Sequence, residues 1–350
     1  MSVQLALLVN PTARGGRTVR LLEPVVRRLR DGGADVSVIV GDDAADALAR
    51  ACTAAAERPD ALVAFGGDGL VHLAVQAVAG TGVPLGIIPA GTGNDIATAF
   101  GLPRGDVLAT ADVVLRMHPR QADAAWITPA APGSAGGTPT TTEVAMGGGG
   151  GGAGFAAGPA SAGSPGGGGE IPTDGGAAEV GGVGTGVGEW FAGVVCCGFD
   201  SRVNERANRL SWPPGMAKYL VALVEELRRF RPIPFRVTLD GGEVIEREAM
   251  LVSVANTSSY GAGMRVCPDA RPDDGLLDVM VLEAVSKAEF LRVFPSVYRG
   301  THVRHPAVSI HRVRAVTLEA PDVVAYADGE RVGPAPVTCS VEPGSLRILT

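Results

Sequence analysis

Short apolar runs alternate with helix-like segments along the first third of the chain. Four runs of strand length are almost continuously apolar: residues 3–10, 34–40, 61–65 and 84–90. Helical stretches lie between them, at residues 18–33, 42–57 and 70–80. Continuously apolar strands separated by helices are typical of a parallel sheet that is covered on both faces. The pattern predicts an N-terminal α/β domain, with its ligand at the carboxyl ends of the strands.

The pattern changes after residue 190. Runs rich in Val, Leu and Ile follow one another there, and several are joined by Asp-Gly or Gly-Gly turns. This arrangement predicts a second domain that is a mostly antiparallel β-sandwich. Residues 214–230, PGMAKYLVALVEELRRF, are the one convincing amphipathic helix of this half.

A glycine-rich insert separates the two halves. Residues 128–189 contain no Lys or Arg and have too little apolar surface to offset their ordering entropy, so they are expected to be disordered. The insert holds five acids, and without it the formal charge of -7 would be about -2. The expected organisation is a first domain at 1–127, the insert at 128–189, a β-rich acceptor domain at 190–338 and a C-terminal strand at 339–350. Packing of that strand on the first domain remains open.

Several classes of protein are disfavoured. No apolar stretch reaches the ~18 residues that a membrane span needs, and the N-terminus MSVQLALLVNP lacks the features of a signal peptide. A soluble cytoplasmic protein is therefore expected. The five cysteines show neither CxxC nor Cys/His ligand spacing, so they are interpreted as reduced core residues.

Three glycine-rich loops follow strands of the first domain. Residues 10–16 follow the first predicted strand, GGDG at 66–69 the third, and GTGND at 91–95 the fourth. Glycines let backbone N–H groups approach a phosphate, and a following helix N-terminus adds positive potential. GxxxxGK[ST] and GxGxxG are both absent, which argues against P-loop and Rossmann sites. The loops predict a nucleotide polyphosphate site. The alternative for Asp68 is a turn former or N-cap.

These loops resemble the successive signatures of the diacylglycerol kinase catalytic family, which includes bacterial lipid kinases and sphingosine kinases. The similar stretches are VNPTARGG, FGGDGLVHLAVQ and PLGIIPAGTGNDIATAFGLP, and the resemblance continues in NTSSYGAGMRVCPDARPDDGLLDVMVLE and in DGE at 328–330. The insert has no counterpart in the family pattern. The resemblance implies an α/β nucleotide-binding domain followed by a β-sandwich domain, with ATP and Mg²⁺ in the cleft between them.

The resemblance also implies roles for individual residues. Asp328 and Glu330 would be the catalytic acid pair; Asp328 is favoured as the base, and the roles within the pair remain open. Asp68 would reach the magnesium directly or through water. Asp274, with the backbone carbonyls of Arg271 and Leu276, would form a structural magnesium site. The residues expected to hold the nucleotide are Asn10, Pro11, Thr12, Gly66, Gly67, Asp68, Gly69, Gly91, Thr92, Asn94 and Asp95.

The implied activity is ATP- and Mg²⁺-dependent transfer of the γ-phosphate to a lipid hydroxyl, with diacylglycerol favoured as acceptor and phosphatidic acid as product. A sphingoid base or another long-chain alcohol is the alternative acceptor, and a non-catalytic lipid or nucleotide sensor is the alternative from another class. Leu70 stands where the family usually has Thr, so a hydroxyl near the phosphates is missing, and the expected consequence is either reduced ATP affinity or an altered choice of nucleotide. Leu70→Thr is expected to lower the KM for ATP.

The expected partners follow from this activity. A lipid alcohol is the substrate, and a peripheral membrane surface is expected because residues 286–314 are rich in Lys and Arg and carry a few aromatic residues. A solvated basic face is the alternative. No nucleic acid is expected, and a homodimer remains an open alternative. The predicted location is the cytoplasm, with peripheral attachment to a membrane.

Overall fold

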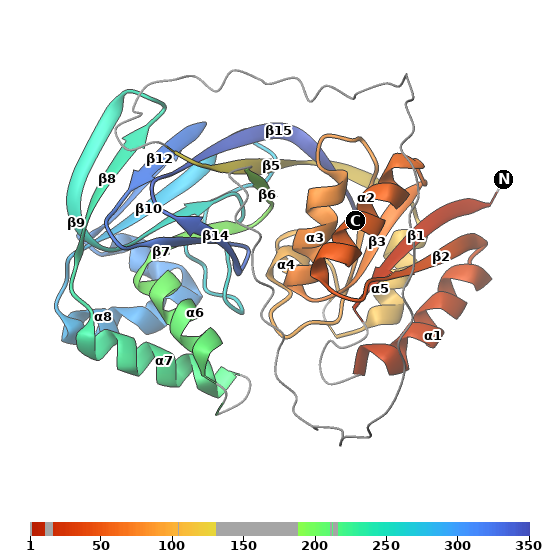
Figure 1. The fold of residues 1–350 in the computed structure, drawn as a ribbon, viewed down its shortest axis with the longest axis horizontal. Coiled ribbons are helices and arrows are strands. Elements are labelled where there is room, and N and C mark those ends of the chain that lie inside the picture. The colour runs from red at the N-terminus through yellow and green to blue at the C-terminus, as the bar shows by residue number, and fades with distance from the viewer. Residues whose placement is uncertain (1, 11–16, 104, 131–187, 211, 213–215) are drawn as a thin grey trace, which may run out of the picture.

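Two domains share one continuous β-sheet (Figure 1). The computed structural model describes residues 2–10, 17–103, 105–130, 188–210, 212 and 216–350. The first domain contributes parallel strands in the order β2–β1–β3–β4. Their bounds are β1 Val3–Val9, β2 Ala34–Val40, β3 Ala61–Gly66 and β4 Leu85–Pro89. The parallel sheet that the apolar runs predict is confirmed.

Helices cover both faces of this parallel sheet. Leu5 and Leu7 of β1 belong to one core cluster, with the helices α1 and α5, whereas Ala6 and Leu8 belong to another, with α2 and α3. Successive residues of a strand point to opposite faces, so a strand buried on both sides must be apolar throughout. The helices are α1 Arg17–Asp31, α2 Ala44–Ala56, α3 Asp68–Val78, α4 Asp95–Ala99 and α5 Val107–Leu115.

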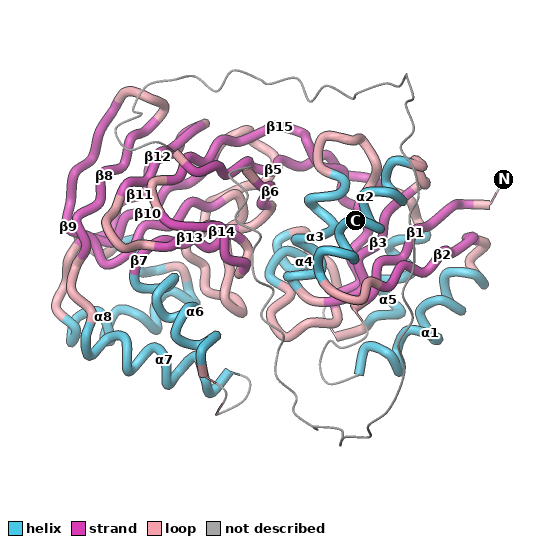
Figure 2. Tube along the Cα trace, viewed as in Figure 1, coloured by secondary structure: helices cyan, strands magenta, loops and turns pink. Residues whose placement is uncertain are grey.

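The second domain is antiparallel, as predicted. Figure 2 shows its strands in magenta above a group of helices in cyan. Its largest apolar core lies between the strands and a set of helices, where the ring of Phe199 packs against Phe230 and Phe290. The strands are β6 Glu189–Phe191, β7 Val194–Gly198, β8 Ile233–Leu239, β9 Glu243–Ala255, β10 Leu277–Glu283, β11 Val308–Val313, β12 Ala315–Glu319, β13 Val324–Ala327 and β14 Glu330–Pro334.

The helices of this domain correct one expectation. The predicted amphipathic helix is present as α7 (Met216–Arg229), but α6 (Phe199–Arg209) and α8 (Lys287–Val293) are helices as well. The sequence of α6, FDSRVNERANR, is mostly polar, and α8 spans only two turns, so neither shows a long apolar periodicity. Two 3₁₀ helices, η1 (Phe294–Arg299) and η2 (Thr301–Arg304), follow α8.

Two long strands run through both domains. β5 (Pro119–Pro129) and β15 (Val337–Leu349) pair antiparallel, and Ile348 of β15 also pairs with Leu85 of β4. Residues 128 and 129 are therefore the end of β5 and residue 189 is the start of β6, although the sequence placed them in the insert. The rest of the predicted insert, 131–187, lies outside the described residues.

Two simpler expectations can be compared with the structure. No helix within the described ranges is both long enough and apolar enough to cross a bilayer. All five cysteines are free; four are buried, whereas Cys52 is exposed, which corrects its assignment to the core. The exposure of Cys52 follows from its place on the outward side of α2, next to the buried Ala51.

The pairing of β15 with the first domain yields a stability prediction. Ile348 is fully buried against the α2–α3 side of the sheet. Ile348→Ala should lower the free energy of unfolding by ~2–5 kcal/mol, because it leaves a cavity between the domains. Urea unfolding measures this loss. Leu108→Ala, at an exposed position of α5, is the control and should cost less than ~1 kcal/mol; an equal loss for both variants would contradict the assignment.

Candidate active site

The loops after β3 and β4 lie in contact. A Cβ atom added to Gly67 would lie 3.1 Å from the Cα of Gly91, and one added to Gly91 would clash with the Cα of Gly67. Both glycines are therefore needed for the close approach. Asn94, in the left-handed conformation, closes the second loop: its Oδ1 accepts from the Gly91 N–H at 2.8 Å and its Nδ2 donates to the Gly91 carbonyl at 2.8 Å.

Asp68 joins these two loops. It is the first residue of α3, and its carboxylate accepts hydrogen bonds from the Asn94 N–H at 2.7 Å and the Ile96 N–H at 3.4 Å. Gly67 holds the N-cap position of α3, and no side chain caps the helix there. The N-cap alternative for Asp68 is therefore wrong. Burial and the negative charge of Asp95 raise the pKa of Asp68 to about 6. The hydrogen bonds from the Asn94 and Ile96 N–H groups lower this pKa, but they do not outweigh the first two effects.

Asp95 connects the first domain to the second. Its Oδ2 accepts from the Ala262 N–H at 2.8 Å and its Oδ1 from the Gly263 N–H at 2.9 Å. A Cβ atom on Gly93 would meet the carboxylates of both Asp68 and Asp95, at 2.7 and 3.3 Å. The two carboxylates thus flank one glycine at the boundary between the domains.

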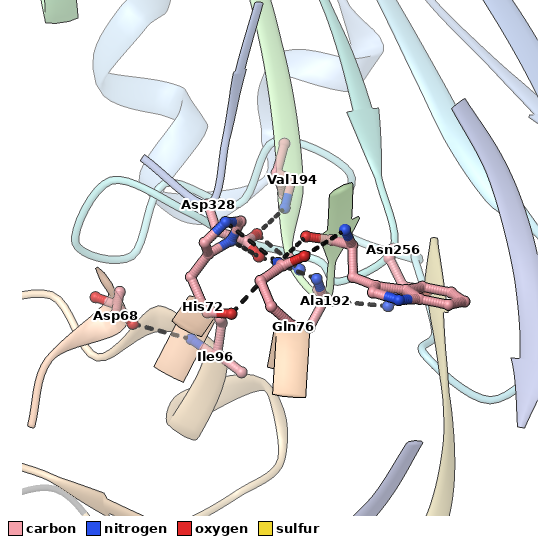
Figure 3. A network of polar contacts seen from close by, with 10 residues as sticks. Asp68, His72, Gln76, Ile96, Ala192, Val194, Asn256 and Asp328 are labelled. Carbon is pink, nitrogen blue, oxygen red and sulfur yellow. Dashed lines mark hydrogen bonds and ion pairs between the residues drawn. The ribbon is translucent and has the colours of Figure 1, made fainter. Parts of the chain in front are cut away.

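Asp328 lies in the hairpin turn between β13 and β14. Asp328 and Gly329 both have positive φ, 53° and 93°, which is the two-residue turn that Asp-Gly favours. The side chain is 1% exposed. Its oxygens accept from three consecutive backbone N–H groups, those of Ala192 at 3.0 Å, Gly193 at 2.8 Å and Val194 at 3.1 Å (Figure 3).

A fourth contact to Asp328 comes from α3. The Nδ1 of His72 lies 3.4 Å from Asp328 Oδ2. Gln76, one turn further along, pairs with the Trp190 backbone: its Nε2 donates to the carbonyl at 2.6 Å and its Oε1 accepts from the N–H at 2.8 Å. This pairing fixes the Gln76 amide, whose Nε2 then faces His72 Nε2 at 3.3 Å. In the neutral imidazole these contacts make Nε2 the acceptor and Nδ1 the donor to Asp328, whereas the protonated ring donates from both nitrogens.

The charge of His72 is set by opposing effects. Burial lowers its pKa, but the hydrogen bond to Asp328 and the charges of Asp328, Glu189 and Glu330 outweigh burial, so the pKa of His72 lies above its ordinary value. Burial also raises the pKa of Glu189, and Asp328 and Glu330 add to this. The domain boundary therefore holds a concentration of negative charge.

Glu330 is placed differently from Asp328. It is partly exposed, and a Cβ atom added to Gly69 would lie 2.7 Å from its Oε1. The Glu330 carboxylate therefore lies beside the first turn of α3, near Asp68. The structure thus brings together four carboxylates that the sequence singled out: those of Asp68, Asp95, Asp328 and Glu330.

A cavity of about 520 Å³ begins at this acidic cluster. Asp68, Thr92, Gly93, Asp95 and Asp328 line one end, and mostly apolar side chains from α6, α7, α8, η1 and the sheet line the rest. Such a volume is typical of a pocket for a small organic ligand. The cavity lies between the sheet of the second domain and its helices.

One wall of this cavity is polar. Asp200, Asn204 and Asn208 follow one another at four-residue intervals along α6 and all line the cavity. Asp200 Oδ2 accepts from the Tyr260 hydroxyl at 2.8 Å, and burial raises the pKa of Asp200 to about 6. The cavity therefore offers a second set of polar groups beyond the acidic cluster.

The loop that holds Asp274 lies apart from the cavity lining. Asp274 Oδ1 accepts from the Leu276 N–H at 3.1 Å, and its Oδ2 pairs with the Arg312 guanidinium. The Arg312 guanidinium therefore occupies the position at which a bound cation would neutralise the Asp274 carboxylate. Asp123 of β5 holds the same loop by accepting from the Gly275 N–H at 2.7 Å. The arrangement does not fit a magnesium ion at Asp274 as long as Arg312 keeps this position.

Of the remaining residues that were predicted to hold the nucleotide, some are described in the structure and some are not. Pro11 and Thr12 lie outside the described residues, whereas Asn10 follows the end of β1. Gly66 is the last residue of β3, and its carbonyl accepts from the Ala90 N–H at 2.7 Å. The nucleotide roles expected of these residues stay predictions.

Leu70 requires a correction. Its side chain is buried among the apolar residues between the sheet and the helices α2 and α3, and it packs on Gly66. A hydroxyl at this position would enter the core, so the expectation that Leu70 removes a phosphate contact does not fit the structure.

Sequence reasoning missed His72 and Gln76, although a signal was present. Asp68, His72 and Gln76 recur every four residues in α3, an otherwise apolar helix that is buried along most of its length. Such spacing places three polar side chains on one face. Asp123 and Asn256 were missed for another reason: Asp123 lies among the alanines of β5 and Asn256 follows directly after β9, and the partners of both are distant in sequence.

The raised pKa of Asp68 yields a pH prediction. The folded state holds the Asp68 proton more tightly than the unfolded state, so ionisation removes stability as the pH rises from about 4 to about 6. Without nucleotide or divalent metal, Asp68→Asn should raise the free energy of unfolding at pH 7.5 by roughly 1–3 kcal/mol. The gain should shrink towards pH 4.5. Urea unfolding at the two pH values measures this, and an identical gain at both would contradict it.

The position of Leu70 yields a second prediction. Leu70→Thr should lower the free energy of unfolding by roughly 1–3 kcal/mol, because it places a hydroxyl in the apolar core and leaves space beside Gly66. The KM for ATP should not fall. Thermal melting and ATP titration measure the two effects, and a lower KM at unchanged stability would restore the original expectation.

Comparisons with known proteins agree with the geometry. Residues 4–127 match the family model described as the diacylglycerol kinase catalytic domain, and residues 193–350 match the YegS C-terminal NAD kinase beta sandwich-like domain. A diacylglycerol kinase of Mycobacterium tuberculosis is 37% identical over 346 residues, which is 99% of this chain and 94% of that protein. One of Bacillus subtilis is 25% identical over 336 residues, 94% of this chain and 90% of that protein.

A solved structure shows the same fold. The crystal structure of a diacylglycerol kinase from Bacillus anthracis superimposes with a TM-score of 0.64 at 18% identity, covering 99% of this chain and 97% of the other. At this identity the likeness concerns the fold alone. On the strength of the whole-length relative and the two matched domains, the chain belongs to the diacylglycerol kinase family and is a lipid kinase.

Proposed function

We propose that the protein transfers the γ-phosphate of ATP to the hydroxyl of diacylglycerol and so forms phosphatidic acid. The observation that carries this proposal is the cavity: its mostly apolar lining suits an acyl chain, and Asp68, Asp95 and Asp328 in that lining lie beside the glycine-rich loops. A lipid hydroxyl and a phosphate can meet at that end. Phosphoryl transfer consists mostly of positioning and charge neutralisation, which such a site provides.

The nucleotide phosphates would lie between the two glycine-rich loops. The contact of Gly67 with Gly91 leaves backbone N–H groups of both loops at one edge of the sheet, where α3 begins. A helix N-terminus attracts negative charge. Thr92 and Gly93, which line the cavity end, would face the transferred phosphate.

The carboxylates Asp68 and Asp95 fit a magnesium ion. In the absence of a cation, burial and the charge of Asp95 hold the pKa of Asp68 at about 6, and a divalent cation would relieve that repulsion. No group of three or more His, Cys, Asp or Glu side chains in the described ranges could hold a metal ion alone. Mg²⁺ commonly uses one or two carboxylates, with water and phosphate oxygens completing its shell. When bound, it would neutralise charge on the phosphates.

The geometry favours Glu330 over Asp328 as the base. An ionised carboxylate has about four acceptor sites, and Asp328 has four donors within reach, three backbone N–H groups and His72. These contacts leave the Asp328 oxygens less available to a substrate proton. Glu330 is partly exposed beside Gly69, so we propose that Glu330 accepts the hydroxyl proton and that Asp328 positions the hairpin which carries it.

A specific observation supports a second acceptor. The carboxylate of Asp200, a partly buried residue, lies in the cavity wall, and a long-chain amino alcohol would bring an ammonium group that could pair with it. Diacylglycerol would instead place ester oxygens near Asn204, Asn208 and the Tyr260 hydroxyl. The acceptor is therefore proposed as diacylglycerol, with a sphingoid base as the second candidate.

The proposed setting is a cytoplasmic protein that works at a membrane surface, because its acceptor resides in a bilayer. The structural magnesium site at Asp274, with Arg271 and Leu276, stays a prediction that requires Arg312 to move. The homodimer also stays an open prediction.

The direct test is transfer of labelled γ-phosphate from ATP, with Mg²⁺, to a panel of lipid alcohols dispersed in detergent. We expect diacylglycerol to be the best acceptor. Preference for a sphingoid base, lost on Asp200→Asn, would establish the second candidate. Binding of Mg²⁺-ATP without transfer to any acceptor would contradict the kinase proposal and favour the non-catalytic sensor.

The two members of the acid pair should fail in different ways. Glu330→Gln should lower kcat by ~10²–10⁴, the usual effect of removing a general base, and should change stability by less than ~0.5 kcal/mol. Asp328→Asn should also lower kcat but should destabilise the fold by roughly 2–4 kcal/mol, because an amide group would face backbone N–H donors.

Thermal melting and kcat, measured on both variants, distinguish these roles. Glu330→Asp serves as the matched control, since it retains the carboxylate and should keep part of the activity. A stable but inactive Asp328→Asn protein together with an active Glu330→Gln protein would reverse the assignment and make Asp328 the base.

A further inference from the structure

The most exposed large apolar side chains gather on one part of the second domain. Among the described residues, the five most exposed are Trp212, Leu220, Val224, Leu291 and Tyr298, at 45–77% exposure, whereas the other exposed large apolar side chains lie at 38–42%. All five belong to α7, α8, η1 or the segment between α6 and α7. Isolated apolar residues on a surface are normal, but a gathering of this kind marks an interaction surface.

The helices that carry these side chains lie side by side. Lys287 at the start of α8 donates from its Nζ to the carbonyl of Arg228 at the end of α7, at 2.6 Å. Leu220, Val224 and Arg228 recur every four residues and so share one face of α7. In Figure 1, α7 and α8 lie along the lower edge of the second domain, with α6 between α7 and the sheet.

This surface has a charge opposite to that of the whole chain. Residues 199–231 and 286–306 hold eleven Lys or Arg against five Asp or Glu, although the chain has a formal net charge of -7. Arg228, Arg229, Lys287 and Arg292 are all exposed next to the apolar side chains. Exposed apolar residues with Trp and Tyr among them, surrounded by basic residues, suit the interface of an anionic bilayer.

The surface is continuous with the cavity. Leu220 and Tyr298 are exposed, and both also line the cavity that ends at the acidic cluster. A lipid that leaves a bilayer at this surface could therefore enter the cavity without crossing water. Of these five exposed apolar residues, Trp212, Val224 and Leu291 do not line the cavity.

We propose that this surface, defined by Trp212, Leu220, Val224, Leu291 and Tyr298 with the adjoining Arg and Lys side chains, docks on an anionic lipid bilayer. Docking places the mouth of the cavity against the bilayer, which explains why Leu220 and Tyr298 are both exposed and part of the cavity lining. The use of the cavity for a lipid acceptor rests on the proposed function, but the docking itself does not.

Flotation with vesicles of phosphatidylcholine alone or with 30% phosphatidylglycerol tests the proposal, without ATP or diacylglycerol present. The full chain should float with the anionic vesicles and much less with the neutral ones, and added salt should weaken binding. Trp212→Ser combined with Leu291→Asp should reduce binding at least tenfold. The matched control combines Val38→Ser with Leu108→Asp, two exposed apolar positions of the first domain, and should bind like the unaltered protein.

Two further measurements, fluorescence quenching and phosphate transfer in detergent, separate docking at this surface from other causes of lost binding. Brominated lipid should quench the fluorescence of the unaltered protein, and Trp212→Phe should remove most of this quenching while vesicle binding persists. Transfer to a short-chain diacylglycerol in detergent should be unchanged in the Trp212→Ser, Leu291→Asp protein, which separates docking from catalysis.

Each contrary result has a distinct meaning. Equal binding of the double variant and its control, or no binding to anionic vesicles, would overturn the docking surface whatever the enzyme does. A dimer that dissociates in the double variant, with no vesicle binding, would make the surface an interface between two copies and would also overturn the proposal. Normal vesicle binding without transfer to any lipid would leave the docking surface standing and overturn the proposed function.

Discussion

The carboxylate of Asp328 is the interaction on which the arrangement of the site depends. A buried charge is tolerated only when hydrogen-bond donors surround it, and here the donors come from the Ala192–Val194 backbone and from His72 of the first domain. One side chain thereby joins the hairpin of β13 and β14, the segment between β6 and β7, and α3. Since Glu330 follows two residues later in that hairpin, its position beside α3 is fixed by the same contacts.

The domains are held in register by more than this carboxylate. β5 and β15 pass through both domains as paired strands, so the parallel and antiparallel parts of the sheet cannot separate without breaking that ladder. Asn256 adds a buried contact, donating from its Nδ2 to the carbonyls of Asp123 and Ala192. Asp95 then connects α4 to the loop around Ala262. A site held in this way has its carboxylates in place before substrate binds, which is the preorganisation that electrostatic catalysis needs.

Local sequence patterns predicted those elements in which buried apolar residues recur regularly along the chain. The parallel strands are apolar throughout because both faces are covered, and the glycine loops mark their carboxyl ends, so the first domain and Asp68 could be located from sequence. The polar helix α6 could not, because its stability comes from one buried face against the second domain, with Phe199, Val203 and Ala207. Its role in the cavity wall also depends on contacts with residues such as Tyr260, far along the chain.

The roles within the site were less accessible from sequence for a related physical reason. A motif such as DGE gives residue types but not the number of donors that reach each oxygen, and that number separates a positioning carboxylate from an available base. Asp274 shows the same limit, because its partner Arg312 lies on another strand. His72 shows no motif spacing in the sequence, and its partner Asp328 lies 256 residues away. Chemistry at a domain boundary is decided by contacts distant in sequence.

The distribution of charge is consistent with the proposed binding of a nucleotide polyanion at one end of the cavity and of a membrane at the other. Negative side chains gather at the domain boundary, where a cation is needed before phosphates can approach, and the raised pKa of Asp68 expresses that need. Positive side chains gather instead on the helices that cover the outer side of the cavity. The apolar cavity lies between these two regions and separates them by low-dielectric material. In the proposed docking, an anionic surface would be attracted to the cavity mouth, while the carboxylates at the inner end would remain available to a metal ion and to the hydroxyl of a lipid.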